Sequence, residues 1–75
     1  MGLLGNDIEY QMSRVRRGEG EGDEQLARRM YYLQMEVLSA NAGCDLVTND
    51  PLDPFRFENL DADTREGWLR KARGK

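Results

Sequence analysis

The sequence predicts an all-α fold: a small three-helix domain with a long central helix and an irregular aromatic and acidic segment before the C-terminal helix. Three stretches combine apolar residues at helical spacing with capping residues at their ends. Both prolines of the chain lie between the second and third of these stretches. The one extended piece that we expect, at residues 46–48, cannot form a sheet alone. All 75 residues are therefore assigned to a single small domain.

The first helix is predicted at about residues 6–17, NDIEYQMSRVRR. Asn6 is the expected N-cap, and acids in the first turn with arginines in the last turn complement the helix dipole. Apolar residues recur at spacings of four, four and three along one stripe, formed by Leu4, Ile8, Met12 and Val15. The next residues, 18–23, alternate glycine with acid, which predicts a flexible hinge.

The second helix is predicted at about residues 24–42, which are rich in strong helix formers and are followed by Gly43, a residue suited to a left-handed helix stop. Helical spacing places Tyr32 on the polar face beside Arg28 and Arg29. The opposite, apolar face is wide enough to contact two other elements. Near its centre lie two amides that need hydrogen-bond partners, Gln34 and Asn41.

Residues 43–60 are predicted to be irregular, because two X-Pro steps disfavour helix in the preceding residues. The third helix is predicted at about residues 61–73, with Asp61 or Asp63 as its N-cap. Its end is basic and contains Arg70, Lys71, Arg73 and Lys75.

Composition argues against several classes of site. The chain has no histidine and a single cysteine, Cys44, so an internal disulfide and the usual zinc sites lack their ligands. EF-hand registers starting at Asp45 or Asp61 place valine or arginine at required ligand positions. Acid pairs lie in polar turns, where nothing in the sequence would raise a carboxyl pKa for acid–base work. We therefore expect no metal, no cofactor and no enzymatic activity.

The charges are segregated along the chain, although the net charge is only −3. Residues 45–66 carry −5, and residues 67–75 carry +4. The basic C-terminal helix could contact phosphates, which gives a nucleic-acid-associated regulator as one alternative. An acidic inhibitor that imitates DNA is another. The basic residues also have a structural explanation, because cations stabilise the C-terminal end of a helix.

The leading hypothesis is a non-enzymatic protein–protein interaction subunit that docks on a larger complex. Exposed aromatic residues flanked by charge are typical of binding hot spots. The candidate partner-binding residues are Tyr32, Phe55, Phe57, Trp68, Arg28 and Arg29. The competing interpretation is that at least one phenylalanine completes the thin core expected of a small domain. Homo-oligomerisation is left open.

The longest apolar run is MYYL, Met30 to Leu33, so no membrane-spanning segment of about 20 residues is expected. The N-terminal residues lack the pattern of a secretory signal. The expected location is the cytoplasm, or a viral particle. Size and class suggest a virus-encoded accessory protein or inhibitor, or a bacterial assembly factor.

Overall fold

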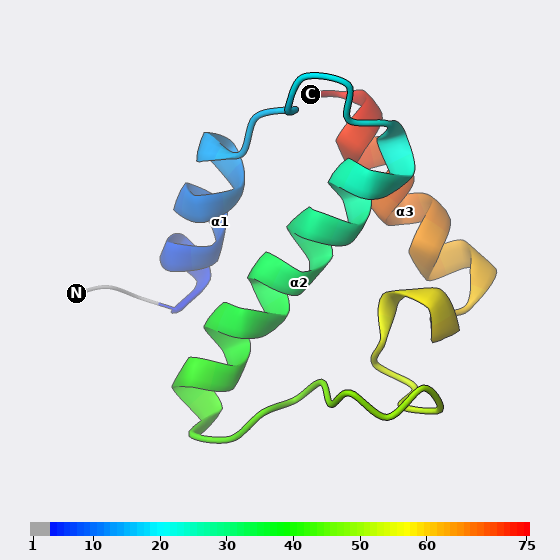
Figure 1. Ribbon diagram of the computed structural model, residues 1–75. Coiled ribbons are helices and arrows are strands. Elements are labelled where there is room, and N and C mark those ends of the chain that lie inside the picture. Colours follow the sequence, from blue (N-terminus) through cyan, green and yellow to red (C-terminus); the bar gives the residue numbers. More distant parts are fainter. Residues whose placement is uncertain (1–3) are drawn as a thin grey trace.

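The computed structural model describes the backbone of residues 4–75 and the side chains of residues 9–75. It contains three α-helices, α1 (Leu4–Arg14), α2 (Asp23–Ala42) and α3 (Ala62–Arg73), and one 3₁₀ turn, η1 (Phe57–Asn59). Figure 1 shows α1 and α3 lying against the long α2, with a long loop returning from the end of α2 to the start of α3. Within the described residues there is no strand. The predicted all-α class with three helices is confirmed.

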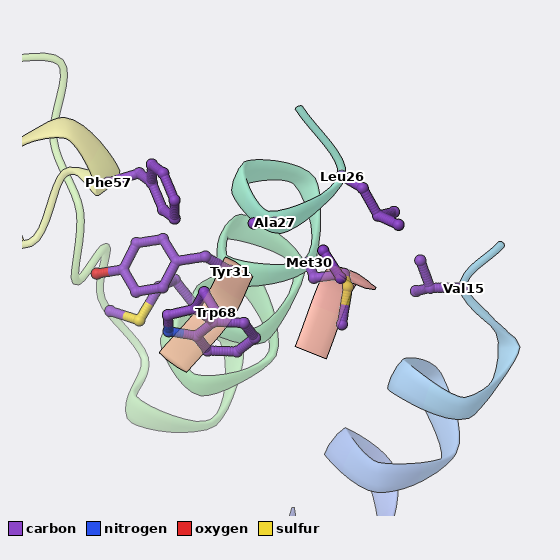
Figure 2. Close-up of a cluster of buried hydrophobic side chains, with 9 residues drawn as sticks. Val15, Leu26, Ala27, Met30, Tyr31, Phe57 and Trp68 are labelled. Carbon is purple, nitrogen blue, oxygen red and sulfur yellow. The ribbon is translucent and has the colours of Figure 1, made fainter. Parts of the chain in front are cut away.

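Helix α1 begins two residues before the predicted cap Asn6 and ends at Arg14, three residues before the predicted end. It stops early because the backbone turns to bury Val15, whose side chain is only 8% exposed. Figure 2 shows Val15 near Leu26 and Met30 of α2. Of the predicted apolar stripe, Met12 and Val15 pack on the core. The side chains of Leu4 and Ile8 lie outside the described part.

The segment between α1 and α2, predicted as a flexible hinge, contains a hydrogen-bonded turn. The backbone N–H of Glu21 donates to the carbonyl of Gly18 at 3.0 Å, and Gly20 adopts a φ of 78°, a conformation that favours glycine. The Arg17 guanidinium fastens this turn to α2 and to α3. It donates to Asp23 Oδ1 at 2.8 Å and to the carbonyl of Ala72 at 2.9 Å.

Helix α2 starts and stops close to the predicted residues for local reasons. Gln25 Oε1 accepts a hydrogen bond from the N–H of Gly22 at 2.8 Å, which is half of a capping box. At the other end Gly43 has a φ of 79°, and its N–H donates to the carbonyl of Ser39 at 2.9 Å. Asn41, predicted near the centre of the apolar face, is exposed and donates to the carbonyl of Val37.

Helix α3 is capped by Asp61, the first of the two predicted caps. Its carboxylate accepts hydrogen bonds from the backbone N–H of Thr64 at 3.3 Å and from the Thr64 hydroxyl at 2.7 Å. Trp68 and Ala72 bury one face of the helix against α2. The predicted extended piece at residues 46–48 has no strand partner and stays irregular.

The core forms on α2 and is closed by the other elements. Its buried side chains are Val15, Leu26, Ala27, Met30, Tyr31, Met35, Phe57, Trp68 and Ala72. The ring of Tyr31 lies at the centre of an aromatic group, with ring centroids 5.8 Å from Phe57 and 5.6 Å from Trp68 (Figure 2). Geometries of this kind contribute about 0.5–1.5 kcal/mol per pair beyond area burial. Phe57 thus joins the loop to the same core that holds α3.

Across residues 4–75, the helices are too short or too polar to cross a lipid bilayer.

Candidate partner-binding surface

In the loop between α2 and α3, acidic side chains accept hydrogen bonds from the loop's own backbone. Asp50 Oδ1 accepts from the N–H of Leu52 at 3.0 Å, and Asp53 Oδ1 accepts from the N–H of Phe55 at 2.9 Å. Each carboxylate therefore closes a turn two residues ahead, as Asp does in Asx-turns. Asp53 Oδ2 also accepts from the N–H and the hydroxyl of Thr48, both at 2.7 Å. We call residues 48–59 the braced loop.

Two further side chains cross the braced loop and hold its halves together. Asn59 Nδ2 donates to the carbonyl of Pro51 at 2.7 Å and to the carbonyl of Asp53 at 2.9 Å. Arg56 donates to the carbonyl of Thr48 at 3.2 Å. These bonds satisfy backbone carbonyls that a loop without regular structure would otherwise leave to solvent.

Two consecutive tyrosines of α2 fasten the braced loop to the helix. The Tyr31 hydroxyl donates to the carbonyl of Phe55, and the Tyr32 hydroxyl accepts from the N–H of Phe57 at 2.8 Å. Burial raises the pKa of Tyr31, so its hydroxyl stays protonated and able to donate. The loop is thereby held to α2 at Phe55 and Phe57, one of which is exposed and the other buried.

Two large apolar side chains of the braced loop remain outside the core. Leu52 is 86% exposed and Phe55 is 53% exposed. Phe57, two residues further on, is fully buried. Single exposed apolar residues are ordinary, but this pair is displayed on one loop whose backbone is held by side-chain hydrogen bonds. Leu52 is absent from the predicted site, and the signal that could have found it is its position between two Asx-Pro turns.

The structure separates the six predicted partner-binding residues. Phe55 is accessible, whereas Phe57 and Trp68 lie in the core at 0% and 7% exposure, out of reach of a partner. Their assignment to the binding surface is therefore corrected: both complete the core, as the competing interpretation held for at least one phenylalanine. Tyr32 is half-buried rather than exposed on a polar face, because the braced loop covers it.

Arg28 and Arg29, the other two predicted residues, are engaged within the chain. The Arg28 guanidinium lies 5.1 Å from the centre of the Phe57 ring and donates to Glu58 Oε1 at 3.0 Å. Arg29 binds both carboxylate oxygens of Glu21, at 2.8 and 3.0 Å, and the carbonyl of Arg16 at 2.6 Å. Arg28 thus secures the braced loop, and Arg29 secures the turn before α2.

Hydrogen bonds from arginine side chains depress two carboxyl pKa values. The hydrogen bond from Arg29 lowers the pKa of Glu21 from 4.5 to about 2, with the Gly18 N–H adding to the effect. Arg56, with Arg28 as a weaker second donor, lowers the pKa of Glu58 from 4.5 to about 2. Both carboxylates are more stable ionised in the folded chain than in the unfolded chain, which ties folding to pH.

We expect the stability of the chain to fall as the pH drops from about 4.5 to about 2. A depressed carboxyl pKa contributes stability that is present above the unfolded value and is lost as the pH falls through the folded value. Urea unfolding across this range measures the effect. Replacing both carboxylates, Glu21→Gln with Glu58→Gln, should lower the midpoint at neutral pH and flatten the acid slope.

Glu19→Gln is the matched control for this titration, since Glu19 is exposed and forms no ion pair with the described side chains. It should leave the acid slope unchanged. An identical slope in the double variant and the wild type would contradict the assignment.

Some cations of the basic C-terminus already have partners within the chain. Arg73 donates to Glu66 at 3.0 Å, and Lys75 Nζ donates to the carbonyl of Met12 at 2.6 Å, so part of the basic charge is already engaged. Among the residues described, no three acidic or cysteine side chains cluster in a way that could hold a metal ion. Cys44 is exposed at the end of α2.

Comparisons of the chain with protein families, with curated proteins and with solved structures found no match.

Proposed function

We propose that this chain is a non-enzymatic protein-interaction subunit that docks on a protein partner through the braced loop. The observation that carries this proposal is the display of Leu52 and Phe55 outside the core by a loop whose backbone is held in place. Phe55 is the predicted partner-binding aromatic that remains accessible. Leu52 is added to it as the second anchor.

Preorganisation supports this role for the braced loop. A partner that binds a flexible loop must overcome the entropy of ordering it, at about 0.5–1.5 kcal/mol for each immobilised side chain with many rotamers. Asp50, Asp53 and Asn59 already fix the backbone on both sides of Leu52. The free energy from burying two apolar side chains is then available for affinity.

The surrounding charge supports a selective contact. Acidic residues flank the apolar pair, and hydrogen bonds from Phe55 N–H and Thr48 hold the pKa of Asp53 below its ordinary value, so that it stays ionised. An apolar centre within a charged rim is the arrangement of many transient interfaces. Charge at the rim steers association and discriminates between partners, whereas the buried anchors supply most of the affinity.

The test compares two tagged chains, the wild type and a loop variant with Leu52→Ser and Phe55→Ser. Each is used to capture partners from the source cells. Loss of two anchors at 2 kcal/mol or more in total should reduce recovery of a specific partner by about thirtyfold or more. Because both side chains are exposed, the free energy of unfolding should change by no more than about 0.5 kcal/mol per site. Quantitative mass spectrometry measures the recovery.

Tyr10→Ser is the matched control, because Tyr10 is 59% exposed and lies on α1, away from the braced loop. It should leave partner recovery unchanged. Equal recovery with the wild type and the loop variant would remove the basis of the proposal.

A further inference from the structure

A groove lies between α1 and α3, across the middle of α2. Its volume is about 460 Å³, within the range of pockets that hold ligands. Met12 and Met30 supply its apolar lining, and the polar residues around them include Ser13 and Gln34. The thioether side chains of methionine adapt to irregular apolar partners. The groove therefore suits one or two apolar side chains of a partner.

The rim of this groove is basic. Arg70, Lys71 and Lys75 line it, against a single acidic residue, Glu9. The Arg70 side chain is 77% exposed, and its contact with Glu66 is long, at 3.9 Å. Lys71 Nζ lies 4.4 Å from the centre of the Trp68 ring. Neither lysine forms an ion pair with any carboxylate described in the structure.

The braced loop is the chemical complement of this groove. It displays an apolar pair, and its residues include three acids, Asp50, Asp53 and Glu58, against one arginine, Arg56. Asp50 and Asp53 stand on either side of Leu52. The loop has two apolar side chains beside acidic residues, and the groove has an apolar lining beside basic residues. The two surfaces therefore match in charge, and the number of exposed apolar side chains matches what the groove can hold.

The loop cannot occupy the groove of its own chain. Met30 and Gln34, which line the groove, are neighbours on one face of α2. Arg28 and Tyr32, which contact the loop at Phe57, lie on nearly the opposite face of the same helix. The hydroxyls of Tyr31 and Tyr32 hold the loop there, so a loop that fills the groove must come from another molecule.

We propose that the groove between α1 and α3 accepts the braced loop of a second copy of this chain, so that molecules associate head to tail. This inference rests on the proposed function of the braced loop and names its partner. Donor and acceptor are different surfaces, so the contact is heterologous and can extend into short chains. A symmetric dimer with two reciprocal contacts is disfavoured, because the groove and the braced loop lie on nearly opposite faces of α2 and do not both face the same second molecule.

Sedimentation velocity of the full chain over a range of concentrations tests the proposal. Larger species should grow with concentration at about 0.01 M salt and diminish at about 1 M salt, where the Debye length falls from about 30 to about 3 Å. A loop variant, Leu52→Ser with Phe55→Ser, should weaken association at least about tenfold. A groove variant, Arg70→Glu with Lys75→Glu, should do the same.

Mixing the two variants gives the sharpest result. The intact groove of the loop variant can accept the intact loop of the groove variant, so the mixture should form a one-to-one dimer that does not extend. Arg14→Glu with Arg16→Glu makes the same change in charge on exposed residues that do not line the groove, and it should retain wild-type association. Far-UV circular dichroism of each variant checks that the helices are intact.

A wild-type chain that stays monomeric at every concentration would overturn the proposal. So would association that survives in either variant, or a mixture of the two variants that forms no dimer. These results are separable from those for the proposed function. If the chain is monomeric but the loop variant still loses a captured protein, the head-to-tail contact is rejected and the braced loop remains a docking surface. A loop variant that keeps its captured partner contradicts the proposed function, whatever the sedimentation result.

Discussion

Replacing Phe57 by alanine is expected to lower the free energy of unfolding by about 3–5 kcal/mol. The ring is fully buried, 5.8 Å from the Tyr31 ring and 5.1 Å from the Arg28 guanidinium, so truncation leaves a cavity between the loop and α2. A chain of 75 residues has a total stability of about 4–11 kcal/mol. The variant should therefore lose a large share of its stability and, at the lower end of this range, be largely unfolded, as measured by urea unfolding followed by circular dichroism.

Phe55→Ala is the matched control, because it removes the same side chain two residues away on the exposed side of the loop. Its free energy of unfolding should change by no more than about 0.5 kcal/mol. If Phe57→Ala does not fold, Phe57→Leu gives a measurable intermediate loss. Equal stability of the Phe55 and Phe57 variants, or normal stability of Phe57→Leu with loss of partner capture, would show that Phe57 is not a core residue.

Phe57 is buried and Phe55 is exposed, and the sequence does not predict this difference. Alternation with Arg56 would place Phe55 and Phe57 on the same side of an extended segment, so it does not predict that one ring is buried and the other exposed. The choice depends on the N–H of Phe57 meeting the hydroxyl of Tyr32, 25 residues earlier in the chain. No local pattern contains that contact, and the same contact explains why Tyr32 is half-buried.

Features set by local chemistry were predictable. The left-handed stop at Gly43 and the Asp61 cap need only neighbouring residues, and both appear at predicted positions. The end of α1 was not predictable in this way. Arginines favour continuation of that helix through residue 17, but burial of Val15 and the bond from Arg17 to the carbonyl of Ala72 draw the chain away from it.

The candidate site shows the same division. The turn signals of the Asp-Pro and Asn-Asp-Pro steps predicted an irregular segment, and the structure has one. They did not predict that Asp50, Asp53 and Asn59 would form hydrogen bonds with the backbone of this same segment. That use of the polar side chains converts a stretch expected to be merely irregular into a loop with a defined exposed pair, Leu52 and Phe55.

Replacing Trp68 by alanine is expected to lower the free energy of unfolding by about 3–5 kcal/mol and to reduce helix content together with it. Trp68 and Ala72 are the buried residues of α3, and a 12-residue helix is marginal in water without tertiary contacts. Far-UV circular dichroism during urea unfolding measures both effects, since the variant lacks the tryptophan needed for fluorescence.

The loss of unfolding free energy in Trp68→Ala distinguishes a core role for Trp68 from the partner-binding role that the sequence predicted. A partner anchor would lose affinity on truncation and keep its stability, whereas an indole that is 7% exposed and 5.6 Å from the Tyr31 ring must lose stability. Trp68→Phe should lower the free energy of unfolding by less than Trp68→Ala does. Lys71→Met, which removes only the cation above the ring, should cost no more than about 1 kcal/mol because the site is exposed. If Trp68→Ala unfolds at the same urea concentration as the wild type, α3 is held by the ion pair of Arg73 with Asp23 and by the hydrogen bond from Arg17 to Ala72 rather than by the indole. The aromatic group around Tyr31 would then not be the centre of the core.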